Sequence, residues 1–233
     1  MIIKKIMPLA IASGLALGAA SASADDGINA ISANVGLTSD YVWRGVSQTN
    51  EDVALQGGFD YAHDSGLYIG TWASNVNFGG GLDGGSTEID VYGGYGGDIS
   101  DNLGYDIGFI YYGYQSDSDL DFLEIQGSLT FYGVTVGLNY SDEFGDGGPK
   151  NLYTHAEYSY SLTENLSLDL HGGYTDTDED DFWEDGEDSY GDWSIGLGAS
   201  FVGLDLSLAY VGTTLDDLDI YDDRAVFTIA KSF

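Results

Sequence analysis

Apolar and polar residues alternate along most of this chain with a period of two. The alternation is clearest in 103–111, 134–140 and 166–170, where apolar and aromatic residues occupy every second position. A period of two is that of a β-strand, in which successive side chains point to opposite faces. Twelve segments fit it, each about ten residues long, which is the length of a tilted strand that crosses a bilayer. They are 30–45, 53–62, 67–76, 87–97, 103–114, 122–131, 134–141, 152–161, 166–175, 190–201, 204–213 and 224–233.

The connectors between these segments alternate in length. Short turns are expected at 63–66, 98–102, 132–133, 162–165 and 202–203, and long loops at 46–52, 77–86, 115–121, 142–151, 176–189 and 214–223. This alternation is typical of an outer-membrane barrel, whose short turns face the periplasm. The expected fold is therefore all-β: a transmembrane, antiparallel, up-and-down β-barrel of about 12 strands. An even number of strands places the N- and C-termini at the periplasmic end.

Charged residues within the segments support a polar lumen. With the apolar parity facing lipid, they fall on the other parity, which is expected because a base at the bilayer midplane would cost about 2–4 kcal/mol. Lys231 is an exception that lies close enough to the chain end to reach the headgroups. In segment 67–76, Leu67 and Ile69 compete with Tyr68 and Trp72 for the outward face, and the pattern does not choose between them. The inward-facing charged residues and histidines are Asp40, Arg44, Asp60, Glu88, Asp90, Asp106, Glu124, His155, Glu157, Asp169, His171, Asp192, Asp205 and Arg224.

Aromatic residues on the lipid parity cluster at two heights, as in the girdles of a membrane barrel. A soluble β-sandwich would also alternate, but it would need neither these two belts nor the alternation of loop lengths. Near the long loops the belt comprises Trp43, Tyr111, Tyr140, Tyr174, Trp193 and Tyr210, and near the short turns Tyr61, Tyr95, Tyr105, Phe131, Tyr160, Phe201 and Phe233.

Residues 1–24 have the three parts of a secretory signal peptide: Lys4 and Lys5, an apolar run, and the Ala22-Ser23-Ala24 cleavage site. We assign the barrel to residues 25–233. The chain carries 39 acids against 6 bases, a formal net charge of −33, and this excludes a nucleic-acid partner, whose phosphates need cations. The expected partners are outer-membrane lipid and lipopolysaccharide, small solutes, and the barrel assembly machinery, whose recognition signal the terminal Phe233 resembles.

The segment 32–49, with Asp40-Tyr41-Val42-Trp43-Arg44-Gly45-Val46-Ser47-Gln48 at its core, resembles the opening of the TorF-type porins of proteobacteria. Residues 54–60 and 70–76 also fit, so the similarity covers 32–76. The resemblance implies an outer-membrane pore. It implies no particular substrate, and it assigns no binding residues.

Arginines and acids near the outer mouth form a first candidate site. Arg44, near the outer end of the first segment, and Arg224, near that of the last, become neighbours when the barrel closes. We expect both on the lumen wall, where opposing acids would create a transverse field that orients dipolar solutes; the alternative is salt bridging that stiffens the barrel. The lumen set is Arg44, Arg224, Asp40, Asp90, Glu124 and Asp106.

A second candidate lies across one hairpin. If its turn centres near Thr163, His155 opposes His171 and Glu157 opposes Asp169, with Cβ atoms about 5 Å apart. A register slip of two would instead pair Glu157 with His171. Such donors suit zinc or copper, and the alternative is an ordinary polar wall.

An acidic loop is the third candidate. Its residues have the spacing of positions 1, 3, 5, 9 and 12 of a calcium loop, although Asp181 stands where an EF-hand needs glycine. Diffuse calcium binding or a merely solvated loop are the two interpretations, and no other cofactor is expected. The residues are Asp176, Asp178, Asp180, Glu184 and Glu187.

The function expected from these patterns is passive diffusion of small solutes across the cell outer membrane, with a mild cation preference caused by the acids. The alternative is a closed barrel that serves as a structural protein, adhesin or receptor through acidic extracellular loops. An enzyme is not expected, because a lipid-facing triad needs an outward histidine. His155 and His171 face inward, His63 lies in a turn, and there is no Gly-x-Ser-x-Gly motif.

Overall fold

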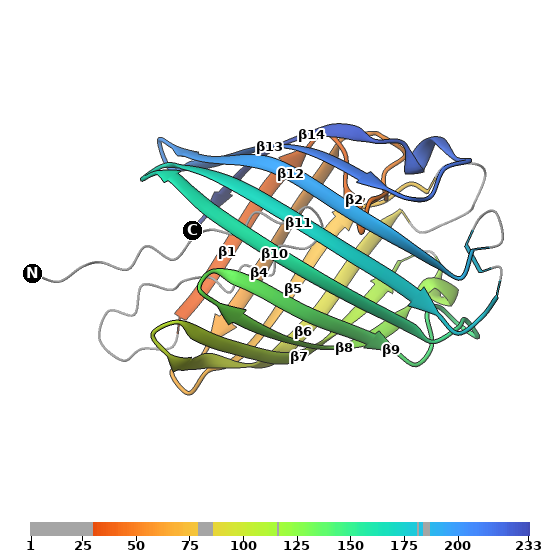
Figure 1. Ribbon diagram of the computed structural model, residues 1–233, viewed down its shortest axis with the longest axis horizontal. Coiled ribbons are helices and arrows are strands. Elements are labelled where there is room, and N and C mark those ends of the chain that lie inside the picture. Colours follow the sequence, from red (N-terminus) through yellow and green to blue (C-terminus); the bar gives the residue numbers. More distant parts are fainter. Residues whose placement is uncertain (1–29, 79–85, 116, 181, 184–186) are drawn as a thin grey trace, which may run out of the picture.

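The computed structural model describes residues 30–78, 86–115, 117–180, 182–183 and 187–233, so the expected signal peptide lies outside the described residues. Within them, twelve strands close into a single antiparallel barrel (Figure 1). The barrel strands are β1 (Ala30–Thr38), β4 (Ala54–Ala62), β5 (Leu67–Asn75), β6 (Thr87–Ser100), β7 (Leu103–Tyr114), β8 (Phe122–Phe131), β9 (Val134–Ser141), β10 (Asn151–Thr163), β11 (Leu166–Thr177), β12 (Ser189–Phe201), β13 (Leu204–Thr213) and β14 (Arg224–Ser232).

Each barrel strand pairs with the next one along the chain, and β1 closes the barrel against β14. The closing register pairs Asn34 with Ser232 and Thr38 with Thr228. Closure leaves the barrel no free edge, so every barrel strand has hydrogen-bonding neighbours on both sides. Because β1 and β14 are antiparallel, the beginning of β1 and the end of β14 lie at the same end of the barrel (Figure 1).

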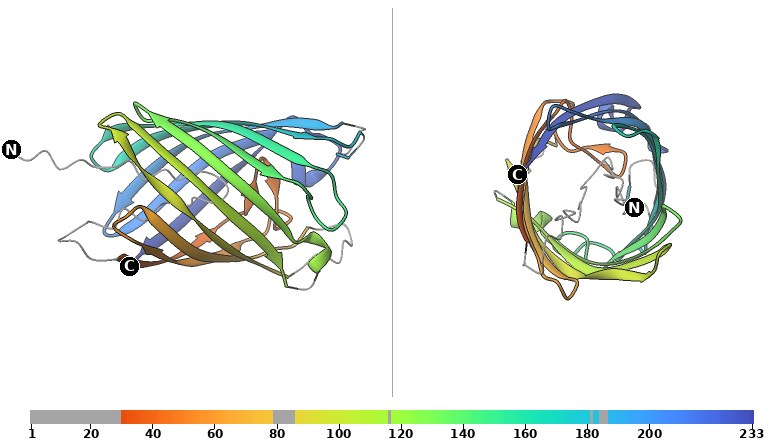
Figure 2. Two further views of the ribbon diagram at one scale, coloured as in Figure 1. Left: turned by 90° about the horizontal axis from the view of Figure 1, so that it is seen from below. Right: turned by 90° about the vertical axis from the view of Figure 1, so that its left-hand side faces the viewer.

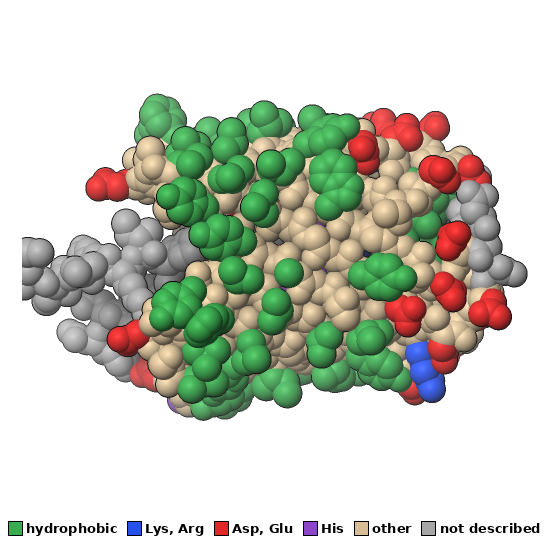
Figure 3. Space-filling view, viewed as in Figure 1, with side chains coloured by type: hydrophobic (Ala, Val, Ile, Leu, Met, Phe, Trp, Pro, Cys, Tyr) green, Lys and Arg blue, Asp and Glu red, His purple; other side chains and the backbone are tan. Residues whose placement is uncertain are grey.

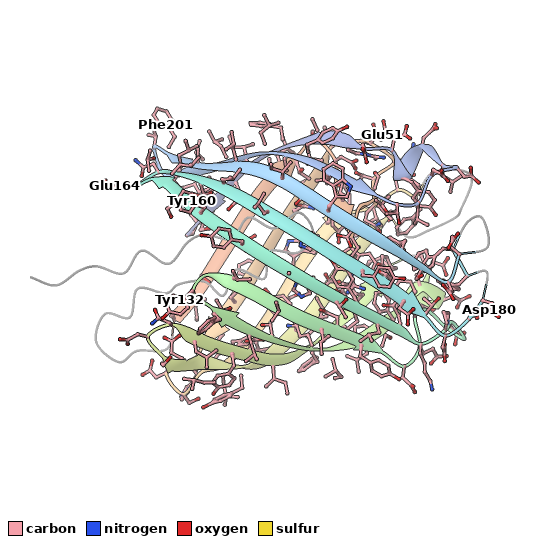
Figure 4. The ribbon with its side chains drawn as sticks, viewed as in Figure 1. Glu51, Tyr132, Tyr160, Glu164, Asp180 and Phe201 are labelled. Atoms are coloured by element: carbon pink, nitrogen blue, oxygen red, sulfur yellow. The ribbon has the colours of Figure 1, made fainter. Side chains whose placement is uncertain are left out.

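That end also carries the short turns and is called here the short-turn end. Tyr132-Gly133 and Val202-Gly203 are two-residue turns with positive φ at both positions, at 49° and 84° in the first and 54° and 74° in the second. Such turns follow the natural twist of the strands that they join. The opposite end, called the loop end, holds the long loops, whose described residues include the short 3-10 helices η1 (Ser118–Leu120) and η3 (Asp219–Tyr221). Figure 4 places Tyr132, Tyr160, Glu164 and Phe201 at the short-turn end and Glu51 and Asp180 at the loop end. The expected alternation of connectors is confirmed.

The outer surface of the barrel is apolar. Phe59 on β4 and Ile107 on β7 are 66% and 58% exposed, and similar side chains form a band around the molecule (Figure 3). An apolar band of this extent is stable in lipid and unfavourable in water. On β5, Leu67 and Ile69 are exposed, whereas Tyr68 and Trp72 pack inside, which answers the question that the sequence left open. Among the described residues, no helix is long and apolar enough to cross a membrane.

The predicted strands match the observed ones closely, apart from the end of the first. The sequence predicts a strand over 30–45, but β1 ends at Thr38 and the chain then leaves the wall. It forms a small hairpin of β2 (Val42–Trp43) and β3 (Val46–Ser47), joined by Arg44 and Gly45 at φ of 47° and 82°. The hairpin strands are themselves extended, so the alternation continues through them and conceals the break.

Candidate functional site

The hairpin and its flanks, residues 40–49, fold into the barrel and are called here the inward hairpin. Figure 2 shows this segment inside the ring of strands when the barrel is viewed along its axis. Val42 packs against Val211 on β13 and Val226 on β14, whereas Arg44 reaches Glu124 on β8. A segment that touches strands on opposite sides of a barrel must lie in its lumen. The inward hairpin therefore narrows any path through the molecule.

The base of the inward hairpin is fixed by Asp40. Ser47 donates a hydrogen bond to Oδ1 of Asp40 at 2.7 Å, and the hydroxyl of Thr49 lies 2.8 Å from the same oxygen. Arg224 on β14 donates to Oδ2 of Asp40 at 3.0 Å and lies 3.7 Å from Glu51. Charge-assisted hydrogen bonds of this kind are stronger than neutral ones. Asp40 thereby ties both arms of the hairpin to the wall.

The tip of the inward hairpin is held by Arg44. Its Nη2 atom donates to both carboxylate oxygens of Glu124 at 2.8 Å, and the two side chains are 5% and 0% exposed. The guanidinium lies between two rings, 4.1 Å from the centre of Trp43 and 3.9 Å from that of Tyr153. Burial lowers the pKa of Arg44, but the Glu124 carboxylate and three neighbouring tyrosines together raise it more, so the pKa lies above its ordinary value. Arg44 is therefore a permanently charged anchor.

Gly45 allows the tip to touch the wall. A Cβ atom at this position would lie 2.8 Å from Cβ of Thr213 and 2.9 Å from the carbonyl oxygen of Gly212, both on β13. The positive φ of Gly45 also disfavours any other residue. The sequence pair Arg44-Gly45 therefore sets both the turn and its fit against the wall.

A third side of the lumen contacts the hairpin through Tyr41. Its hydroxyl donates to Oε1 of Glu88 at 3.0 Å, and its ring packs edge-on against Trp72 with centroids 5.3 Å apart. Asp90 lies beside Glu88 on β6, is fully buried, and makes no hydrogen bond through its carboxylate among the described residues. The strongly polar lumen wall expected from the sequence is thus observed at this height.

Three placements expected from the sequence are wrong. Arg44 does not lie on the wall of the first strand but at the tip of the inward hairpin, because β1 ends at Thr38. The two arginines do not form one pair against shared acids: Arg44 binds Glu124, and Arg224 binds Asp40. Trp43, expected in the outer aromatic belt, packs instead against Tyr112 and Phe122 inside the barrel.

Asp106 does face the lumen, as expected, and it accepts a hydrogen bond from the hydroxyl of Tyr68 at 2.8 Å. The expected calcium loop is only partly described. Asp176 belongs to β11, Asp178 accepts the backbone N–H of Lys150 at 2.7 Å, and Glu184 lies outside the described residues. One oxygen of this set is therefore already used by the backbone, and the calcium site stays a prediction.

An aromatic cavity of about 250 Å³ lies above the inward hairpin at the loop end. Sequence reasoning missed it because four of its rings, those of Phe78, Phe144, Phe182 and Trp183, come from loops that were interpreted through their acids and glycines. Bulky rings within acidic loops are the signal that could have found it, since loops seldom need them for solubility. Its lining is Trp43, Val46, Gln48, Phe78, Tyr114, Leu120, Phe122, Phe144, Gly145, Phe182, Trp183 and Tyr190.

The histidine cluster forms on the lumen face of β10 and β11. Glu157 is paired with His171, which is the slipped register of the two considered from the sequence. The hairpin turns at Glu164 and Asn165 and not near Thr163, with a register irregularity between Ser161 and Thr163. Asp169 is consequently opposite Ser159, accepts hydrogen bonds from Ser159 and Ser167, and is not part of the cluster. His155, Glu157 and His171 bring three potential ligand atoms within 4.8 Å of one another.

A closed antiparallel barrel with an apolar exterior, a polar interior and an inward-folded loop has the architecture of a porin. Two solved porin structures share it. NanC porin has a TM-score of 0.56 at 9% identity, covering 86% of this chain and 98% of its own. KdgM porin has a TM-score of 0.52 at 8% identity, covering 88% and 98%. These likenesses concern the fold.

At the level of sequence, the chain belongs to the Gcw_chp family, described as bacterial proteins of unknown function, whose model matches residues 20–233. No curated protein matches the sequence. The family description names no activity, so the resemblance to TorF-type porins stays a prediction.

Proposed function

We propose that this protein is a channel of the bacterial outer membrane that admits small solutes past the inward hairpin, with both chain ends on the periplasmic side. The observation that carries the proposal is the inward hairpin itself, a loop anchored in the lumen at its base by Asp40 and at its tip by Arg44. A loop folded into a barrel of intermediate width sets the size of what passes. The fold shared with NanC and KdgM porins supports this reading.

The charges favour cations and neutral solutes over polyanions. A structure of KdgM porin holds disordered oligogalacturonate, a polyanion. In the present chain the net charge is −33, and the lumen arginines Arg44 and Arg224 are each already bound to a carboxylate. A polyanion would have to compete with those carboxylates. We therefore propose that the solute is neutral or cationic and that it carries a ring or apolar face, which suits the aromatic cavity.

We propose no catalytic activity. His155 and His171 point into the lumen, and His63 lies in a turn of the short-turn end, where it contacts Ser65.

Single-channel current in a planar bilayer tests the proposal. The exported protein is purified in detergent, and folding is verified by its heat-modifiable mobility on a gel. Discrete current steps are expected, and neutral sugars or organic cations should interrupt them at lower concentrations than oligogalacturonate does. A membrane that stays silent after verified insertion would reject the channel and favour the alternative of a closed barrel that acts through its acidic loops.

A further inference from the structure

We propose that His155, Glu157 and His171 bind a divalent transition-metal cation of the zinc type inside the barrel. His155 and Glu157 are two positions apart on β10, so both face the lumen, and His171 is the partner of Glu157 across the β10–β11 ladder. The site is therefore fixed by strand register alone. It lies on rigid wall strands and not on the inward hairpin or the loops.

The spacing of the ligand atoms suits a metal ion. Nδ1 of His155 and Nδ1 of His171 each lie 3.5 Å from Oε1 of Glu157. A tetrahedral zinc ion with bonds of about 2.0–2.1 Å separates its ligands by roughly 3.3 Å. Neither Nδ1 atom makes a hydrogen bond to the described residues, although both are buried. Three donors thus converge on one point without satisfying one another.

The hydrogen-bonding partners of Nε2 of His171 leave its Nδ1 atom available to an ion. Nε2 of His171 lies 2.7 Å from Oδ1 of Asp192 and 2.9 Å from the hydroxyl of Tyr153. A proton on Nε2 that is directed to Asp192 leaves the lone pair of the neutral ring on Nδ1, which faces Glu157. A carboxylate behind a ligating histidine is the usual outer shell of a zinc site. The side chain of His171 is nine-tenths buried, so the ring is also held by packing.

Glycines make room for this arrangement. A Cβ atom at Gly137 on β9 would overlap the imidazole of His155, which stacks on the Tyr153 ring at a centroid distance of 5.4 Å. A Cβ at Gly173 would overlap Tyr153 and Asp192. Both glycines lie mid-strand, where glycine costs stability and a close approach gives a reason for it. The absence of a side chain at these two glycines leaves the space that His155, Tyr153 and Asp192 occupy.

The donor set also indicates which ion fits. Two imidazoles and one carboxylate favour zinc or copper over calcium or magnesium, which prefer oxygen ligands. Three protein ligands leave the fourth position to water. Glu157 is 27% exposed, so an ion can arrive from the lumen. This inference does not depend on the proposed channel, because a closed barrel would present the same three ligands.

Zinc binding by the detergent-purified barrel tests the site. Calorimetric titration with ZnCl₂, in the presence of excess CaCl₂ to occupy the acidic loops, should show one zinc ion per barrel, and Co²⁺ should give the absorption of a tetrahedral site. His171→Gln and Glu157→Gln should each abolish or strongly weaken binding, and Asp192→Asn should weaken it about 10- to 100-fold. His63→Gln, at an exposed turn, should leave it unchanged.

A variant that keeps every ligand guards against simple misfolding. Gly137→Ala should displace the ring of His155 and weaken zinc binding while heat-modifiable mobility stays as in the parent. Absence of zinc binding by the parent at millimolar zinc would overturn the proposal. So would undiminished binding by His171→Gln or Glu157→Gln, and the cluster would then be an ion-free hydrogen-bonding network. None of these readouts requires current, so a silent membrane and an absent metal site are separate results.

Discussion

Each arginine of the lumen is bound by a carboxylate from a distant part of the chain. Arg44 and Glu124 are 80 residues apart in sequence, and Asp40 and Arg224 are 184 apart. The first pair is the more buried, with Glu124 fully shielded from solvent. Removing one member of a buried ion pair costs far more than removing an exposed one, because the remaining charge keeps its desolvation penalty. The position of the hairpin tip in the lumen therefore depends on Glu124.

Glu124→Gln is expected to release the hairpin tip. The charge of Arg44 would stay buried without a counter-ion, at a cost of about 3–5 kcal/mol. Single-channel recordings should show a larger or more frequently open current than in the parent, and the unfolding midpoint in urea should fall. Lys150→Gln is the matched control, because Lys150 and Asp142 form an exposed pair at 4.0 Å, with side chains 55% and 81% exposed. Identical currents and midpoints in Glu124→Gln and the control would contradict the prediction.

The inward hairpin is the element that departs most from a regular barrel. Its strands β2 and β3 contain only two residues each, so it cannot stand alone, and it relies on the contacts of Tyr41, Val42 and Arg44 with the wall. An isolated hairpin is marginal in water. We therefore expect the hairpin to leave the lumen as a unit when its contact with β13 is disturbed.

Gly45→Ala should increase the fraction of molecules in which the inward hairpin is detached from β13. A left-handed backbone costs alanine about 1–2 kcal/mol, which corresponds to about a 5- to 30-fold change in population. Because the chain has no cysteine, Val42→Cys introduces a single thiol at a buried position of β2, and its maleimide labelling rate reports on release. Labelling should be slow in Val42→Cys and faster when Gly45→Ala is added.

The matched reference for this labelling is Ser118→Cys in η1, an exposed position at the same end of the barrel. It should label quickly whether or not Gly45→Ala is present. Equal labelling rates of Val42→Cys with and without Gly45→Ala would show that the contact between Gly45 and β13 does not hold the hairpin.

At the scale of the whole molecule, charge is distributed unevenly. Acidic side chains gather at the loop end, whereas the sides of the barrel are apolar (Figure 3). The net charge of −33 is therefore concentrated largely where a solute would enter. A negatively charged mouth raises the local concentration of cations and lowers that of anions.

A KCl gradient across the bilayer should accordingly give a reversal potential of the sign for K⁺ over Cl⁻. The Debye length shrinks from about 10 Å at 0.1 M salt to about 3 Å at 1 M. The preference should therefore weaken as both compartments are made more concentrated at a fixed ratio. A preference for Cl⁻, or one that does not change with salt, would show that the loop acids do not control the ions that pass.

The barrel strands can be predicted from the sequence because the period-two alternation of apolar and polar residues is a local pattern, visible without knowledge of tertiary contacts. The segments 122–131, 134–141 and 204–213 are predicted with the bounds that the structure shows for β8, β9 and β13. The candidate sites depend on tertiary detail that alternation does not contain. The inward hairpin keeps the extended pattern of β1, so Arg44 is placed in the lumen but on the wrong element.

The metal cluster illustrates the same limit. The sequence places His155, Glu157 and His171 on one face, but their partners depend on where the hairpin turns and on the irregularity next to that turn. A change of two in register replaces Asp169 by His171 as the partner of Glu157 and leaves Asp169 opposite Ser159, and the two candidate registers have equally good alternation. The aromatic cavity needs contacts among loops that share no periodicity at all.

The last barrel strand, β14, also supplies part of the surface on which the inward hairpin packs. Val42 rests on Val226, and Asp40 is bound by Arg224, both within the last ten residues of the chain. This docking site therefore does not exist until the last strand has joined the barrel. The chain must be finished, and its two ends joined, before the inward hairpin can settle. Docking of the inward hairpin against β14 is thus coupled to closure of the barrel.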